Sequence, residues 1–322
     1  MNIAVIGLGS MGKRRIRLIK ELYPENNIYG VDLRVDRKVE AEDTFLIRCY
    51  SDISEIPIKC DCAFVCTSPL SHAPIIKDCL SKECHVFTEM NLVDDGYDDN
   101  LQLAEKNKRI LFLSSTFLYR DEPRYIRERI DSERKWNYVY HVGQYLPDWH
   151  PWENYKDYFV GENRTNGCRE IMSIELPWLT TAFGCIENTT VLCDKLTQLE
   201  IGYPDNFMIQ LLHENGNKGC LIVDVVSPCA VRKFEAYAEG RYLFWGGTPD
   251  SLIEYNSVTG EAEQVSFQEE VEHNERYRSY IVENAYRNEI REFFDIVSGE
   301  KEPIYGFEQD RKVLEWIDVI GA

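Results

Sequence analysis

Short apolar runs alternate with amphipathic stretches through the first third of the chain. The alternation predicts strands at residues 2–6, 28–32, 45–48, 61–66, 84–88 and 110–115. Apolar positions at helical spacing predict helices at 11–23, 71–82 and 98–107. Strands that alternate with helices form a parallel sheet with helices on both faces. We therefore predict an α/β, doubly wound domain for residues 1–118.

Beyond residue 118 the pattern becomes rich in strands. A helix predicted at 123–131 precedes β-rich runs at 136–145, 189–203, 206–214, 219–226, 233–240 and 241–246. Turn sequences such as ENGNKG join several of them, which indicates antiparallel hairpins. Further helices are predicted at 168–183, with Gly184 as its end, and at 277–297 and 308–320. Residues 119–322 are thus predicted to form an α+β domain with a mainly antiparallel open sheet, whose last helices can pack back on the first domain.

Composition narrows the class of protein. The 322 residues are 44% hydrophobic and 28% charged, with a net charge of −19, which repels nucleic acid and anionic membranes. No apolar run reaches the ~20 residues of a membrane span, and the start lacks the basic region of a signal peptide, so we expect a cytoplasmic protein. The eleven cysteines fit reduced thiols. No metal site is expected, because the Cys60–Cys62 pair has no second pair at ligand spacing.

Basic residues cluster at 13–17 and at 120–129. Such clusters could supply donors to a phosphate-bearing ligand. Most of the individual residues are better interpreted as ordinary solvated helix faces.

A glycine-rich turn follows the first predicted strand. In GLGSMG, Gly7 permits the turn, Gly9 lets the backbone approach a pyrophosphate, and Gly12 lets the helix pack closely. Asp32 ends the next strand, where a carboxylate would bind ribose hydroxyls and repel a 2′-phosphate. This arrangement predicts a Rossmann dinucleotide site that favours NAD over NADP, although Arg34 could reach a phosphate. The predicted loop also contains Leu8, Ser10 and Met11.

The motifs GLGSMG, VCTSPLSH, HVFTE and FLYRDEP together resemble the glucose–fructose oxidoreductase/inositol dehydrogenase family, Gfo/Idh/MocA, over nearly the whole chain. The resemblance implies a nicotinamide-dependent oxidoreductase of a sugar or polyol that forms a homodimer or homotetramer. It also implies that Glu89 lies near the nicotinamide. A loop beside the cofactor would contain Thr67, Ser68, Pro69 and His72.

The chain departs from the family pattern at the reactive centre. Met90 and Asn91 stand where a Glu-Lys-Pro motif has its lysine and proline, and Met90 cannot titrate. Ile171 and Ile174 fall where many members carry an Asp-x-x-His pair. Loss of a positioned acid–base group typically costs ~10²–10⁴ in rate.

Two segments could replace the missing groups. One is the predicted helix at 168–183, where Glu175 is a candidate, although Glu175 could equally pair locally and Arg169 and Glu170 could be solvated. The other is the aromatic stretch 143–159, in which prolines bracket His150. Its aromatics could form walls for a sugar ring, or could instead fill a domain or subunit contact. His150 is the first catalytic candidate because it titrates near neutrality without help. Tyr145 is a further catalytic candidate, and the substrate-binding candidates are Arg120, Asp148, Trp149, Trp152 and Arg169.

Three functions fit these observations. The first is an NAD-dependent oxidoreductase of a sugar or nucleotide-sugar with a rebuilt acid–base centre. The second is a redox-neutral sugar enzyme in which NAD oxidises and then re-reduces the substrate. The third is a non-catalytic protein that binds NAD or a sugar. The complete dinucleotide fingerprint favours the first.

Overall fold

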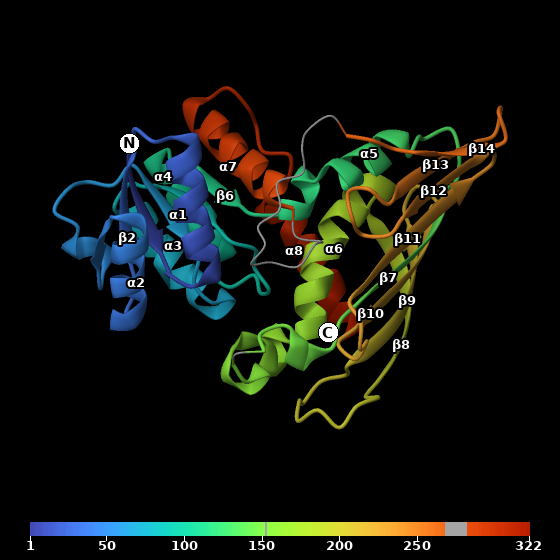
Figure 1. Ribbon diagram of the computed structural model, residues 1–322, viewed down its shortest axis with the longest axis horizontal. Coiled ribbons are helices and arrows are strands. Elements are labelled where there is room, and N and C mark those ends of the chain that lie inside the picture. Colours follow the sequence, from blue (N-terminus) through green and yellow to red (C-terminus); the bar gives the residue numbers. More distant parts are fainter. Residues whose placement is uncertain (152, 268–281) are drawn as a thin grey trace. The chain divides into compact units, whose positions relative to one another are not determined.

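The structure is a computed structural model that describes residues 1–151, 153–267 and 282–322 (Figure 1). The chain divides into two units. The first contains Met1–Ser115 and Tyr286–Gln309, and the second contains Thr116–Ala285 and Asp310–Ala322. Helix α7 (Glu283–Ser298) therefore lies mostly in the first unit, and α8 (Phe307–Ile320) mostly in the second.

The first unit is built on a parallel sheet of six strands in the order β3-β2-β1-β4-β5-β6. Its helices occupy the chain between the strands, so the predicted doubly wound α/β fold is confirmed. The strands are β1 (Asn2–Ile6), β2 (Asn27–Val31), β3 (Arg48–Tyr50), β4 (Cys62–Val65), β5 (His85–Thr88) and β6 (Leu111–Leu113). The helices are α1 (Ser10–Leu22), α2 (Val35–Phe45), α3 (His72–Ser81) and α4 (Tyr97–Asn107).

One strand of this unit was predicted in the wrong place. Of the predicted residues 45–48, only Arg48 belongs to the strand, because α2 continues to Phe45 and ends at Leu46, whose φ is 53°. The strand β3 follows at Arg48–Tyr50. Helix α2 was missed because only Ala41 of its eleven residues is buried, so the helix lacks the apolar face on which the prediction depended.

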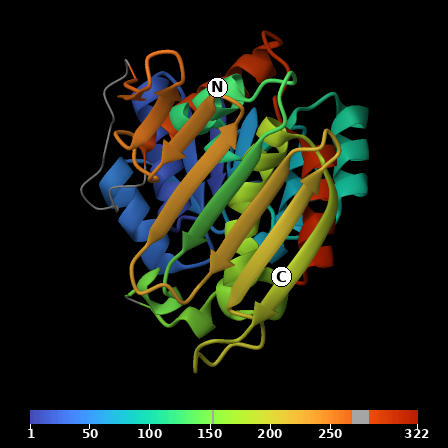
Figure 2. The same ribbon diagram turned by 90° about the vertical axis from the view of Figure 1, so that its right-hand side faces the viewer.

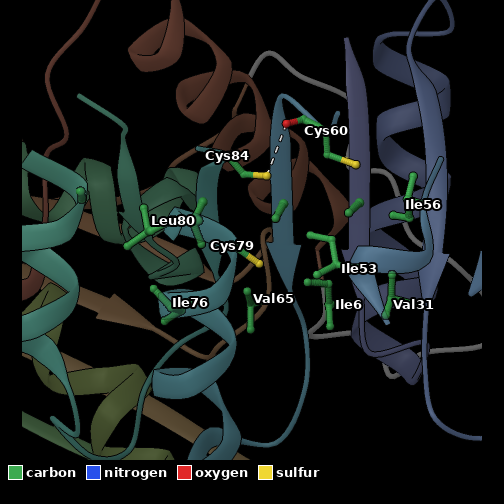
Figure 3. Packing of buried hydrophobic residues seen from close by; sticks show 14 residues of the cluster. Ile6, Val31, Ile53, Ile56, Cys60, Val65, Ile76, Cys79, Leu80 and Cys84 are labelled. Carbon is green, nitrogen blue, oxygen red and sulfur yellow. Dashed lines mark hydrogen bonds between the residues drawn. The ribbon is translucent and has the colours of Figure 1, made fainter. Parts of the chain in front are cut away.

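Side chains of the parallel strands alternate between two buried faces. Ala63 and Val65 of β4 belong to a core with Cys79 and Leu80 of α3 (Figure 3). On the opposite face, Phe64 stacks on Phe87 at 4.8 Å between ring centroids and contacts Phe293 of α7 at 5.3 Å. Both faces of β4 are therefore covered, as a parallel sheet requires.

The second unit is built on an eight-stranded sheet in the order β14-β13-β12-β11-β7-β10-β9-β8 (Figure 2). Only β7 and β10 pair in parallel, so the predicted mainly antiparallel sheet is confirmed. The strands are β7 (Asn137–Gly143), β8 (Ile186–Asp194), β9 (Asn206–His213), β10 (Lys218–Asp224), β11 (Val231–Ala238), β12 (Arg241–Trp245), β13 (Leu252–Asn256) and β14 (Glu261–Gln264).

Details of this unit differ from the prediction. The expected strand at 189–203 begins earlier and ends at Asp194, and β13 and β14 were not predicted. Of the helix expected at 277–297, residues 277–281 lie outside the described residues, and α7 runs to Ser298. No helix within the described ranges has the length and apolar character needed to cross a membrane.

Helix α6 (Gly167–Phe183) packs on one face of this sheet. Trp178 and Phe183 are buried against Tyr140 and Tyr138, with ring centroids 5.5 and 4.3 Å apart. The helix ends at Gly184, whose φ of 99° favours glycine. Helix α5 (Asp121–Arg129) completes the helices of the unit.

Candidate functional site

The turn between β1 and α1 has the geometry of a dinucleotide-binding loop. Gly7 has a φ of 91°, and a Cβ there would lie 2.7 Å from the carbonyl oxygen of Cys66. A Cβ on Gly12 would lie 1.9 Å from the carbonyl oxygen of Gly7. Gly9 is different, because the nearest atom to its Cβ would be Nη1 of Arg37 at 3.7 Å. The fold thus requires glycine at positions 7 and 12, and position 9 faces open space.

Helix α1 begins directly after this turn, at Ser10. No side chain caps its N-terminus, and its first turn holds no acidic residue. Its first N–H groups and the positive end of its dipole are therefore available to a pyrophosphate.

Asp32 lies at the end of β2, beside the glycine turn. Its Oδ2 accepts a hydrogen bond from the backbone N–H of Leu8 at 2.7 Å, and its Oδ1 accepts one from the N–H of Arg34 at 2.8 Å. These bonds hold the carboxylate at the position where a ribose would be recognised.

Two arginines lie near this carboxylate. The guanidinium of Arg34 pairs with Asp36 through Nε at 3.1 Å and Nη2 at 2.5 Å. Nη1 of Arg37 lies 3.7 Å from Oδ2 of Asp32 and is also the atom nearest to Gly9. Arg37 was missed in the sequence because it belongs to the unpredicted helix α2. It is the arginine closer to the place of a 2′-phosphate.

We predict that NAD(H) binds more tightly than NADP(H), because Asp32 would repel a 2′-phosphate at close range. Asp32→Ala should narrow the difference in affinity, and Arg37→Gln should widen it by removing the nearby positive charge. Arg34→Gln is the matched control and should change the ratio of the NAD(H) and NADP(H) affinities less than Arg37→Gln does. Calorimetric titration of both cofactors measures this, and equal or reversed affinities in the wild type would contradict the prediction.

The loop after β4 contains the residues that the family resemblance placed beside the cofactor. His72 is buried, with Nε2 2.9 Å from the carbonyl oxygen of Thr67 and Nδ1 2.7 Å from Oδ1 of Asn91. Ser71 donates to Oγ1 of Thr67 at 2.8 Å. Ser68 is exposed and Pro69 is buried. His72 therefore fixes the backbone of this loop, and Asn91, in place of the family's proline, is its partner.

Glu89 belongs to a buried charged cluster within the first unit. Arg15 donates to both of its oxygens, at 2.7 and 3.1 Å, and also donates to Glu289 of α7 at 2.7 Å. Glu289 further accepts from the hydroxyl of Ser114 and the N–H of Ser115. Burial raises the pKa of Glu289, and the charge of Arg15 partly offsets the rise. The interpretation of most residues of the basic clusters as solvated does not hold for Arg15, because its side chain is fully buried.

In the second unit, the aromatic stretch 143–159 folds into short helical turns against the start of α6. The indole Nε1 of Trp149 donates to the carbonyl of Gln144 at 3.1 Å, and a Cβ on Gly167 would lie 3.5 Å from its ring. The ring of His150 stacks on Tyr158 at 4.7 Å, and its Nδ1 lies 2.9 Å from Glu153. Trp149 therefore packs against the start of α6, and the next residue, His150, packs on Tyr158.

The other candidates of this stretch are more scattered. Asp148 is exposed, and Tyr145 is partly buried, with its backbone N–H donating to Ser227. Trp152 lies outside the described residues. The hydroxyl of Tyr155 accepts a hydrogen bond from the backbone N–H of Glu200 at 3.2 Å.

Glu175 is fully buried and pairs locally. Its Oε1 accepts from Nη2 of Arg232 at 2.5 Å, and its Oε2 accepts from Tyr140 at 2.7 Å and from Trp178 at 2.8 Å. Burial raises the pKa of Tyr140, and the charge of Glu175 adds to the rise. Both oxygens of Glu175 are occupied, so in this geometry it orients Arg232, whose side chain keeps 15% exposure.

The two arginine candidates form ion pairs inside the second unit. Arg120 donates to Glu122 at 3.2 and 2.5 Å, and its guanidinium lies over the ring of Trp245. Arg169 donates to Asp318 at 2.6 Å and to the carbonyl of Ala322 at 2.8 Å. These contacts tie α6 to the end of the chain.

Glu170, one residue further along α6, is not the solvated side chain that the sequence left open as one alternative. Its Oε2 is enclosed and has no hydrogen-bond partner, and burial raises its pKa from 4.5 to about 7. The sequence carried one signal, which is that Ile171 and Met172 follow it directly in an otherwise apolar segment. A carboxyl that titrates near neutrality without a cation is a feature of functional sites.

Comparisons with known proteins agree with this geometry. Residues 1–115 match the model of an oxidoreductase family with an NAD-binding Rossmann fold, GFO_IDH_MocA. No curated protein matches the chain.

Solved structures share the fold over the whole chain. A levoglucosan dehydrogenase in complex with NADH and levoglucosan is 13% identical, with a TM-score of 0.81 over 99% of this chain and 96% of that one. An oxidoreductase from Agrobacterium radiobacter in complex with NAD⁺, L-tartaric acid and magnesium is 13% identical, with a TM-score of 0.82 over 99% and 94%. A UDP-N-acetylglucosamine 3-dehydrogenase from Acidithiobacillus ferrooxidans is 12% identical, with a TM-score of 0.77 over 99% and 96%. Together with the glycine turn and Asp32, the match of residues 1–115 shows that this part of the chain is similar to the NAD-binding Rossmann domain of the GFO_IDH_MocA oxidoreductase family.

Proposed function

We propose that the protein is an NAD-dependent oxidoreductase that acts on a sugar or nucleotide-sugar, with an acid–base centre in its second unit. The observation that carries the proposal is that Trp149 packs against the start of α6 while the adjacent His150 stacks on Tyr158. Aromatic rings beside a few polar groups suit the alternating apolar and hydroxyl faces of a sugar. Two of the structural neighbours are named as dehydrogenases of levoglucosan and of UDP-N-acetylglucosamine, which supports this substrate class.

The acid–base group must differ from the lysine of the family pattern. Met90 has no proton to exchange. Glu175, the second candidate, has both oxygens occupied by three donors, which supports a role in orienting Arg232. The side chain of His150 is 39% exposed, and its Nδ1 lies 2.9 Å from Glu153. Of His150 and Glu175, His150 is therefore the better candidate for contact with a sugar hydroxyl.

His150→Ala should lower kcat/KM for the sugar by ~10²-fold while NAD affinity stays unchanged. Loss of a proton-transfer group would appear in kcat, and loss of a binding contact would appear in KM. Steady-state NADH absorbance against sugar concentration measures both. Wild-type kcat/KM in this variant would remove His150 from the site.

A screen of NADH formation against free sugars, polyols and nucleotide-sugars tests the proposed function directly. The proposal expects turnover with at least one member of these classes. Conversion of a sugar without net NADH formation would favour the redox-neutral function. NAD binding with no conversion would favour the non-catalytic function. That function is considered because Met90, Ile171 and Ile174 place apolar side chains at the family's reactive positions.

We also propose that the subunits form a homodimer or homotetramer through the face of the eight-stranded sheet opposite α6. Val139, Met208 and Tyr237 are 40, 47 and 45% exposed, on strands of that sheet. A sheet face with such exposed apolar side chains is suited to burial against another copy. Sedimentation velocity should show a dimer or tetramer, and a monomer at micromolar concentration would contradict this.

A further inference from the structure

Glu170 occupies an unusual electrostatic environment in the first turns of α6. Neither of its carboxyl oxygens has a donor or a cation among the described residues, and burial is the single cause of its raised pKa of about 7. Oε2 is enclosed, and Glu170 as a whole residue is partly exposed. The carboxyl group is thus largely desolvated, although the residue keeps some contact with solvent.

The neighbours of Glu170 come from the aromatic stretch and from the segment before β9. Tyr158 and Tyr203 are close enough that the charge of Glu170 contributes, after burial, to raising the pKa of each. Tyr203 donates to the carbonyl of Val160 at 2.7 Å, which fastens this segment over the start of α6. The hydroxyl of Tyr158 is itself enclosed and has no hydrogen-bond partner among the residues that the structure describes.

His150 joins the same group of side chains because its ring stacks on Tyr158 at 4.7 Å. Glu153, which also adds to the pKa of Tyr158, pairs with His150. The titratable side chains that face Glu170, directly or across Tyr158, are therefore Tyr203, Tyr158, His150 and Glu153. None is a lysine or an arginine, so no cation holds the Glu170 carboxyl group in its ionised form.

We propose that Glu170 is the general acid–base residue of the sugar site, and that His150 binds the sugar beside it. This inference rests on the proposed function and names the residue that exchanges the proton. In the oxidation of a secondary alcohol, the carbinol C–H bond breaks and its electron pair passes to NAD⁺ as hydride. The O–H bond also breaks, its electrons form the C=O bond, and its proton passes to Oε1 of Glu170. The alcohol becomes a ketone, NAD⁺ becomes NADH, and the carboxylic acid then releases its proton to solvent.

A base of this kind must be ionised to act, so sugar oxidation by the wild type should accelerate as pH rises through about 7. Glu170→Gln keeps the shape of the side chain and removes its titration. It should lower kcat by ~10²-fold or more and leave KM for the sugar and the affinity for NAD nearly unchanged. The rise in oxidation rate with pH near 7 should also disappear. Glu170→Asp should restore part of the activity. Glu162→Gln, at an exposed position of the same segment, is the matched control and should behave as the wild type.

A second readout does not depend on activity. The native pKa of Glu170 lies above its ordinary 4.5, so the wild type should lose stability as pH rises from 4.5 through about 7. Glu170→Gln should lack this loss of stability. The two proteins should therefore have the same unfolding midpoint when they are compared near pH 4.5, and the variant should have the higher midpoint above pH 7. Fluorescence of the tryptophans, which lie in the second unit where described, follows the transition.

The outcomes separate this inference from the proposed function. Wild-type kcat and an unchanged pH profile in Glu170→Gln, with sugar turnover intact, would overturn the role of Glu170 and leave the proposed function standing. No turnover of any free sugar, polyol or nucleotide-sugar by the wild type would overturn the proposed function and this role with it. Equal pH dependence of stability in both proteins would overturn the raised pKa on which the role depends.

Discussion

Replacing Arg15 by methionine should destabilise the first unit by about 3–5 kcal/mol, because it leaves two buried carboxyl groups without their shared cation. Arg15 is fully buried and donates to Glu89 and Glu289, which come from β5's end and from α7. The described tryptophans all lie in the second unit, so their fluorescence does not report this loss. Hydrogen exchange of the β1 and β5 amides measures it in the first unit. Arg17→Met, on the same helix, removes a partly exposed pair with Glu21 and should cost less than about 0.5 kcal/mol.

The loss in Arg15→Met should depend on pH. Burial raises the pKa of Glu289 and Arg15 restrains the rise, so removing Arg15 raises that pKa further. A carboxyl with a raised native pKa reduces stability as pH rises from its ordinary 4.5 through the native value. The difference in unfolding free energy between Arg15→Met and the wild type should therefore be larger at pH 7 than at pH 5. A loss of unfolding free energy that is independent of pH, or smaller than the loss in Arg17→Met, would contradict the description of Arg15, Glu89 and Glu289 as a buried charged cluster.

Two glycines of the turn should respond differently to alanine. Gly12→Ala places a Cβ 1.9 Å from the carbonyl oxygen of Gly7, so α1 must shift. We expect a loss of about 1–3 kcal/mol in stability, and a fall in NAD affinity of roughly 10- to 100-fold from the same free energy. Gly9→Ala meets no atom closer than 3.7 Å and should leave stability unchanged. It should still weaken NAD binding, because the added methyl group lies where the backbone approaches the pyrophosphate.

Calorimetric titration with NAD and thermal unfolding of the two variants measure these effects. Equal losses of stability at both positions would show that the turn is not packed as described. Unchanged NAD affinity in Gly9→Ala would mean that the pyrophosphate does not bind at this turn.

The fold and the cofactor turn could be predicted because their signals are local. The spacing of Gly7, Gly9 and Gly12 follows a strand and precedes a helix, and Asp32 comes at the end of the next strand. Each of these residues acts through its own backbone or its immediate neighbours. The alternation of apolar runs with helices likewise determines a parallel sheet.

The environments of single charged side chains could not be predicted in the same way. Arg15 lies in a basic run that resembles a solvated face, and its burial depends on Glu289, 274 residues away. The partner of Glu175, on helix α6, is Arg232 of strand β11, and the desolvation of Glu170 depends on the segment folded over α6. Helix α2 was missed for the converse reason, because its polar surface gives no periodic signal. The burial and the partners of these charged side chains therefore depend on long-range contacts, which the pattern along the chain does not show.

Transfer of deuterium from a sugar to NAD⁺ tests the central claim most directly. A sugar substrate found in the absorbance screen, labelled with deuterium on the carbon that bears the reacting hydroxyl, is incubated with the protein and NAD⁺. Mass spectrometry of both products then follows the label. The proposed oxidoreductase predicts singly deuterated NADH together with an unlabelled keto-sugar in equal amount. Deuterium that stays on, or returns to, the sugar with no net NADH, or no transfer at all by a protein saturated with NAD⁺, would contradict it.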